Sequence, residues 1–69
     1  MVDGDSRVPS EELAALQLLA RGYTIEQIAR LLQTTPAEVQ AHLDRLMLRL
    51  DAHSRQRAVA IALRLGLIV

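Results

Sequence analysis

The stretch from Thr24 to Leu50, TIEQIARLLQTTPAEVQAHLDRLMLRL, contains two helix-start signals a short distance apart. In the first, Thr24 and Gln27 have capping-box spacing, so the threonine hydroxyl can accept from a helix amide while the glutamine side chain reaches back to the threonine amide. The apolar residues that follow share one helix face, namely Ile25, Ile28, Ala29 and Leu32. This part of the stretch therefore predicts an amphipathic helix that begins after Thr24.

The second start signal is formed by Thr35, Pro36 and Glu38. Thr35 is a good N-cap, proline suits the first helical position, and Glu38 is placed to complete a second capping box. One apolar stripe follows, made of Val39, Leu43, Leu46 and Leu50. Only about Gln33 and Thr34 remain between the two helices, which fits a steep crossing. The stretch predicts a helix-turn-helix corner, with an ordinary helical hairpin in a small bundle as the alternative.

One further helix is predicted on each side of this corner. The first runs from about Pro9 or Ser10 to Arg21 and stops at Gly22, because glycine readily adopts the left-handed conformation that ends helices. Its apolar face is expected to contain Leu13, Leu16 and Ala20. The last helix follows a Ser54 cap, runs to about Leu65 and stops at Gly66.

Length indicates one small domain, and the four predicted helices make it all-α. The chain has 69 residues, and a domain of this size buries only about 60% of the surface of its unfolded chain. Hydrophobic residues make up 51% of the sequence and aromatic residues only 1%, so the core must consist of aliphatic side chains. We expect the domain to cover residues 8–69, after a short, polar and acidic tail at residues 1–7 that is predicted to be flexible.

Several classes of function lack the residues they require. The chain has no cysteine, and neither His42 nor His53 has a partner at metal-ligand spacing, so we expect no metal site and no cofactor. No glycine-rich phosphate loop and no evident nucleophile accompany the histidines, so we do not expect an enzyme. The longest apolar run, Ala58 to Leu63, is far shorter than the roughly 20 residues of a membrane span. We expect a soluble, cytoplasmic protein without a signal peptide.

Charge is balanced overall but unevenly distributed. Eight arginines and eight acidic residues give a formal net charge of zero, whereas nucleic-acid-binding domains usually carry a basic surplus. Up to Arg30 there are three arginines and five acids, and from Leu31 onward there are five arginines and three acids. The positive half is the one that carries the second helix of the corner.

The predicted helix from Ser54 to Leu65 is apolar on two sides. One side is defined by Ala58, Ala62 and Leu65. Ala60 and Leu63 point away from it, and one small core cannot cover both sides. A second copy of the chain across a twofold axis is the simplest cover for Ala60 and Leu63. The alternative is that residues 67–69 fold back over them.

A set of residues spread over all four predicted helices carries a family resemblance. In the first helix and its turn these are Glu12, Leu16, Leu18, Leu19, Ala20 and Gly22, and in the second they are Thr24, Ile28, Ala29 and Leu32. The third helix contributes Thr35, Val39, His42, Leu46 and Leu50, with Arg49 where lysine is usual. The last helix contributes Ser54, Arg55, Ala58, Val59, Gly66, Leu67 and Ile68. With these residues the chain from Val8 to Ile68 resembles the LuxR-type (GerE-like) helix-turn-helix domain of bacterial transcription regulators. The corner of sigma-factor region 4 is similar only from Gly22 to Leu50.

This resemblance implies a DNA-binding transcriptional regulator, or its output domain, that docks the helix from Pro36 to Leu50 in the major groove of double-stranded DNA as a homodimer. The residues expected at the DNA are Thr24, Thr35, Ala37, Gln40, Ala41, His42, Asp44, Arg45, Arg49 and Arg55. Pairing through the fourth helix is expected to use Arg57, Ala60, Leu63 and Arg64.

The face of the third helix opposite Val39 is the one available to a partner. At 100° per residue it consists of Ala37, Gln40, Ala41, Asp44, Arg45 and Leu48. Gln40 suits an adenine edge, Ala41 a thymine methyl group and Asp44 a cytosine amino group, although the family commonly places basic residues here. In the alternative hypothesis, the fold has been reassigned to protein-protein interaction with weak or no DNA binding, through an apolar patch that includes Leu48.

Overall fold

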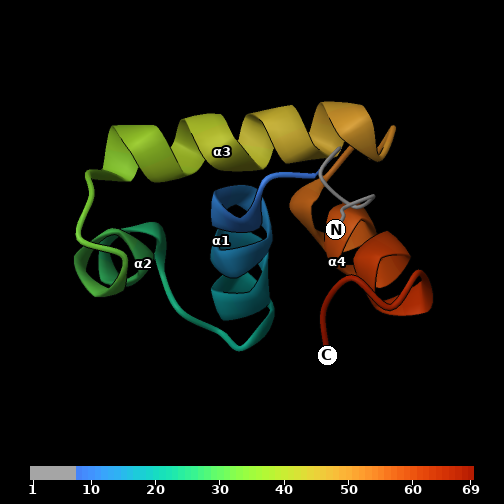
Figure 1. Ribbon diagram of the computed structural model, residues 1–69, viewed down its shortest axis with the longest axis horizontal. Coiled ribbons are helices and arrows are strands. Elements are labelled where there is room, and N and C mark those ends of the chain that lie inside the picture. The colour runs from blue at the N-terminus through green and yellow to red at the C-terminus, as the bar shows by residue number, and fades with distance from the viewer. Residues whose placement is uncertain (1–7) are drawn as a thin grey trace, which may run out of the picture.

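The computed structural model describes residues 8–69, which form four helices (Figure 1). These are α1 (Ser10–Ala20), α2 (Ile25–Leu31), α3 (Pro36–Arg49) and α4 (Arg55–Arg64). No strand occurs within the described range, and the predicted all-α, four-helix fold is confirmed. No helix in that range is long and apolar enough to cross a membrane. The tail predicted at residues 1–7 lies outside the described residues.

The longest helix, α3, organises the domain. In Figure 1 it runs along the top, with α1 beneath its middle, α2 at one end and α4 at the other, and it packs against all three. Every helix contributes small or branched aliphatic side chains to one core. Its buried members are Ala15, Leu16, Ile28, Ala29, Val39, Leu43, Leu46, Ala52, Ala58, Ala62 and Ile68. The core is therefore aliphatic, as the composition predicted.

The predicted caps begin the last three helices. Thr24 and Gln27 form both bonds of a capping box, with Oγ1 accepting at 3.1 Å and Oε1 accepting at 2.9 Å from the two backbone amides. Thr35 Oγ1 accepts from the Glu38 amide at 3.1 Å, and Ser54 Oγ caps α4 in the same way. The second capping box is only half formed, because the Glu38 carboxylate lies beside His42 instead of returning to the Thr35 amide.

All four helices end in the same way. A residue with positive φ follows each C-cap, and these residues are Gly22, Gln33, Asp51 and Gly66. The next amide then returns to the carbonyl five residues earlier, as in Thr34 N to Ala29 O at 2.8 Å, which is the Schellman pattern. The two glycines were predicted as stops. Gln33 and Asp51 adopt the same left-handed conformation although they are not glycine. Gln33 forms the tight corner after α2, and Asp51 forms the turn after α3.

Two predicted face assignments are wrong, both at helix ends. Ala20, the last residue of α1, is exposed, and the buried residues of that helix are Glu12, Ala15 and Leu16. Leu65 is 60% exposed, while Ala58 and Ala62 are buried as expected. Both misplaced residues lie where a helix extends past the core, so angular position alone does not bury them.

The C-terminal residues 67–69 fold back onto the domain, but they contact the core and α1 instead of covering Ala60 and Leu63. Ile68 is buried in the core, and Val69 exchanges two hydrogen bonds with the Gln17 side chain of α1, at 2.6 and 3.0 Å. Ala60 and Leu63 stay exposed. The outer side of α4 is therefore available to a partner.

Candidate nucleic-acid interface

The corner turns one face of α3 inward and the other outward. Val39, Leu43 and Leu46 are at most 1% exposed, so packing fixes the rotation of the helix about its axis. The predicted partner face then points away from the core. Its exposed members are Ala37, Asp44, Arg45 and Leu48, while Gln40 and Ala41 are half-buried. His42, which was also predicted to face DNA, is half-buried as well.

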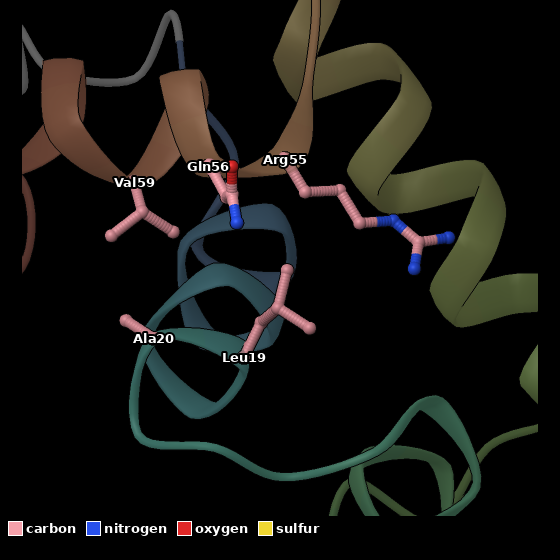
Figure 2. Close-up of a pocket in the computed structure, with 5 residues that line it drawn as sticks. All are labelled: Leu19, Ala20, Arg55, Gln56 and Val59. Carbon is pink, nitrogen blue, oxygen red and sulfur yellow. The ribbon is translucent and has the colours of Figure 1, made fainter.

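Gln40 links this face to the start of α4. Its Nε2 donates to Asp44 Oδ1 at 3.0 Å, and its Oε1 accepts from Arg55 Nη2. Figure 2 shows Arg55 extending from α4 toward α3 and away from Val59 and Ala20. The structure thus brings three of the predicted DNA-facing residues into one hydrogen-bonded group, the Gln40 network, defined as Arg55, Gln40 and Asp44.

A second group is centred on His42. Its Nε2 lies 3.9 Å from the Glu38 carboxylate, and its Nδ1 lies 3.5 Å from Arg45 Nη1. A guanidinium can only donate, so this contact fits a ring whose Nδ1 is unprotonated. The described residues contain no group of three potential metal ligands.

Thr24 and Thr35 lie exposed at the N-terminal ends of α2 and α3. Each hydroxyl oxygen already accepts from a helix amide. A hydroxyl has one hydrogen to donate as well, so both threonines can cap their helices and still offer a donor to an approaching phosphate.

Arg49 differs from the other arginines of the predicted interface. Its Nε donates to Glu12 Oε1 at 3.0 Å, and Glu12 is only 1% exposed. The pair joins the first turn of α1 to the last turn of α3. Sequence reasoning did not identify this pairing, and an acidic residue among the buried positions of α1 was its only signal.

The residues predicted for pairing lie on the outer side of α4. Arg57, Ala60 and Arg64 line an open groove of about 400 Å³ together with Ile61, Asp51 and His53. Leu63 is 49% exposed. Arg55 and Arg57 are two positions apart and so point to opposite sides of α4, one toward α3 and the other toward this groove.

A second groove, of about 370 Å³, separates the end of α1 from the start of α4 (Figure 2). It is lined by Leu19, Ala20, Arg55, Gln56 and Val59. This is where Ala20 lies instead of in the core. Among the described residues, no acid or histidine lines the groove.

Comparison with known proteins gives two matches. Residues 10–62 match the family described as bacterial regulatory proteins, luxR family, a range that includes α1, α2, α3 and most of α4. The chain is also 37% identical over 62 residues to "Uncharacterized response regulatory protein YgeK" of Escherichia coli (strain K12). That alignment covers 90% of this chain and 42% of the relative, so the chain spans less than half the length of that protein. Every predicted DNA-facing residue lies within the range matched to the family.

Proposed function

The chain belongs to the luxR family of bacterial regulatory proteins, a family of DNA-binding regulators, and from this we propose that it docks α3 in the major groove of duplex DNA as a homodimer. The observation that carries the proposal is the outward face of α3, which the buried stripe turns away from the core. We also propose that it acts in the cytoplasm.

The shape of this face supports close approach to base edges. Ala37 and Ala41 have the smallest side chains after glycine, and they lie in the N-terminal half of α3, the part that a recognition helix inserts most deeply. The major groove is about 12 Å wide and admits one helix. Ala41 is suited to contact a thymine methyl group there.

Phosphate contacts are assigned to the residues around the face. Arg45 and Arg55 are both exposed, and the hydroxyls of Thr24 and Thr35 add neutral donors. If Arg45, Arg49, Arg55 and Arg57 each met one phosphate, the salt slope would be about −4 per subunit. However, Arg49 binds Glu12 and Arg57 points to the other side of α4. Two ionic contacts per subunit predict a salt slope of about −2 instead of about −4.

Fluorescence anisotropy with random duplexes across a salt series tests this docking. We expect salt-dependent binding with a slope of about −2 per subunit, and Arg45→Ala should reduce the magnitude of that slope by about 1. Arg21→Ala removes the same charge at the end of α1 and should leave the slope unchanged. If no salt-dependent binding is detected up to about 100 μM protein, the range of non-specific binding, the proposal is wrong.

Pairing is proposed through the outer side of α4, with Ala60 and Leu63 in contact across a twofold axis. A twofold dimer places its two recognition helices about 34–36 Å apart along one side of the duplex, or a multiple of that, so the site is expected to contain inverted half-sites. Sedimentation should show a concentration-dependent dimer that Leu63→Glu converts to monomer. Leu31→Glu changes another exposed leucine, on α2, and should leave the dimer intact. A wild-type protein that stays monomeric at millimolar concentration contradicts this arrangement.

A second candidate function is protein contact through the same face, and the exposure of Leu48 favours it. This side chain is 82% exposed and lies on the same stripe as Ala37, Ala41 and Asp44. If the face binds another protein, Leu48→Gln should abolish capture of that partner without changing helicity or DNA affinity. Loss of DNA affinity with unchanged partner capture would instead count against this candidate.

A further inference from the structure

We propose that Asp44 reads the amino group of a cytosine in the major groove, and that Gln40 positions Asp44 instead of reading a base itself. The inference rests on the proposed docking of α3 and adds to it the chemistry of one base pair. It follows from the hydrogen bonds of the Gln40 network.

Asp44 presents an acceptor to whatever docks on α3. Its side chain is exposed on the outward stripe, and its Oδ1 accepts from Gln40 Nε2 at 3.0 Å. Among the described residues no hydrogen bond reaches its Oδ2. An ionised carboxylate can only accept, so it favours a base edge that donates.

Cytosine is the base that fits such an acceptor. Its major-groove edge offers the N4 amino donor, whereas guanine presents two acceptors and thymine presents one acceptor and a methyl group. Adenine also has an amino group, but its N7 acceptor lies next to it and faces the carboxylate unfavourably. The negatively charged phosphates repel the Asp44 carboxylate. Its charge is therefore better tolerated over the base edges than beside the DNA backbone.

Both ends of the Gln40 amide already form a hydrogen bond within the protein, so an adenine contact would have to use the remaining lone pair and the remaining N–H. Bidentate pairing with adenine requires the glutamine carbonyl to accept and its NH₂ group to donate to the base. Here the carbonyl accepts from Arg55 and the NH₂ group donates to Asp44. Gln40 therefore orients the carboxylate and ties it to a cation on α4, which keeps Asp44 pointing outward at the middle of α3.

Selection of bound duplexes from a random pool, followed by affinity measurements on the enriched site, tests the inference. We expect a C·G pair at one position of each half-site, preferred over T·A by about 5- to 150-fold. Asp44→Asn should largely remove that preference, because an amide offers a donor as well as an acceptor, and it should raise affinity for random DNA. Replacing the cytosine by 2-pyrimidinone, which lacks the amino group, should weaken wild-type binding and leave the variant nearly unaffected.

Glu38→Gln is the matched control, because it removes one negative charge from the same helix outside the Gln40 network. It should raise affinity for random DNA and keep the preference for cytosine. Gln40→Ala should reduce the preference in the wild-type background and have no effect on it in the Asp44→Asn background, since residues that act through one another are not additive.

Three results would overturn the inference, and they are distinguishable. An enriched site whose base preferences do not change in Asp44→Asn contradicts it and leaves docking of α3 intact. Equal affinity for all duplex sequences also contradicts the inference. It would leave only a non-specific docking of α3 on DNA. Failure to bind any duplex removes both the inference and the proposed function.

Discussion

The two faces of α3 are held in place by different interactions. On the inner face, Val39, Leu43 and Leu46 are buried by packing against the other helices. On the outer face, Gln40 and Asp44 are held by hydrogen bonds to each other and to Arg55 of α4. The inner face holds the fold together, and the outer face is the one that we propose recognises DNA. A substitution should therefore affect stability or binding according to the face it alters.

The largest expected difference is between two leucines of α3. Leu43→Ala removes a side chain that is 1% exposed, and deletions of this kind cost about 2–5 kcal/mol of unfolding free energy. Leu48→Ala removes one that is 82% exposed and should change stability by less than about 0.5 kcal/mol. Urea unfolding followed by circular dichroism measures both. Equal destabilisation by the two substitutions would show that α3 is rotated from the orientation described.

A smaller difference is expected between two arginines one turn apart. Arg49→Ala leaves the buried Glu12 carboxylate without its guanidinium, and losing one partner of a buried pair costs about 3 kcal/mol. The Arg49 side chain is 41% exposed, so the loss of unfolding free energy should be about 3 kcal/mol or less. Arg45→Ala should leave stability nearly unchanged, because its only hydrogen bond among the described residues is a long one, to His42.

Adding Glu12→Gln to Arg49→Ala provides the control for this pair. A neutral amide costs less to bury than an unpaired carboxylate, so the double variant should recover part of the lost stability. If Arg49→Ala alone is as stable as the wild-type protein, the Glu12 contact does not support the fold.

Local sequence patterns were sufficient to predict most of the fold. Capping residues such as Thr24 and Thr35, glycine stops and the spacing of the Val39 stripe are set by near neighbours, and the four helices begin and end close to the expected residues. Gln33 and Asp51 were not predicted to adopt left-handed conformations, because neither is glycine. Ala20 and Leu65 were misplaced because the periodicity of a helix does not indicate where the core stops.

The site was less predictable, since its key contacts join distant parts of the chain. The predicted DNA-facing residues include Arg49, yet its bond to Glu12 spans 37 positions of sequence and has no local signal. Gln40 and Arg55 are 15 positions apart and belong to different helices. Their contact depends on how α4 packs at the end of α3, and it is the basis for the proposed role of Gln40 in orienting Asp44.

Methyl NMR during titration with duplex DNA tests the central claim most directly, namely that the outer face of α3 contacts the duplex. The methyl groups of Ala37 and Ala41 should shift strongly, because both lie on that face, and the exposed methyl groups of Val69 at the C-terminus should not. Shifts at Val69 with no change at Ala37 and Ala41 would contradict the docking of α3 in the major groove.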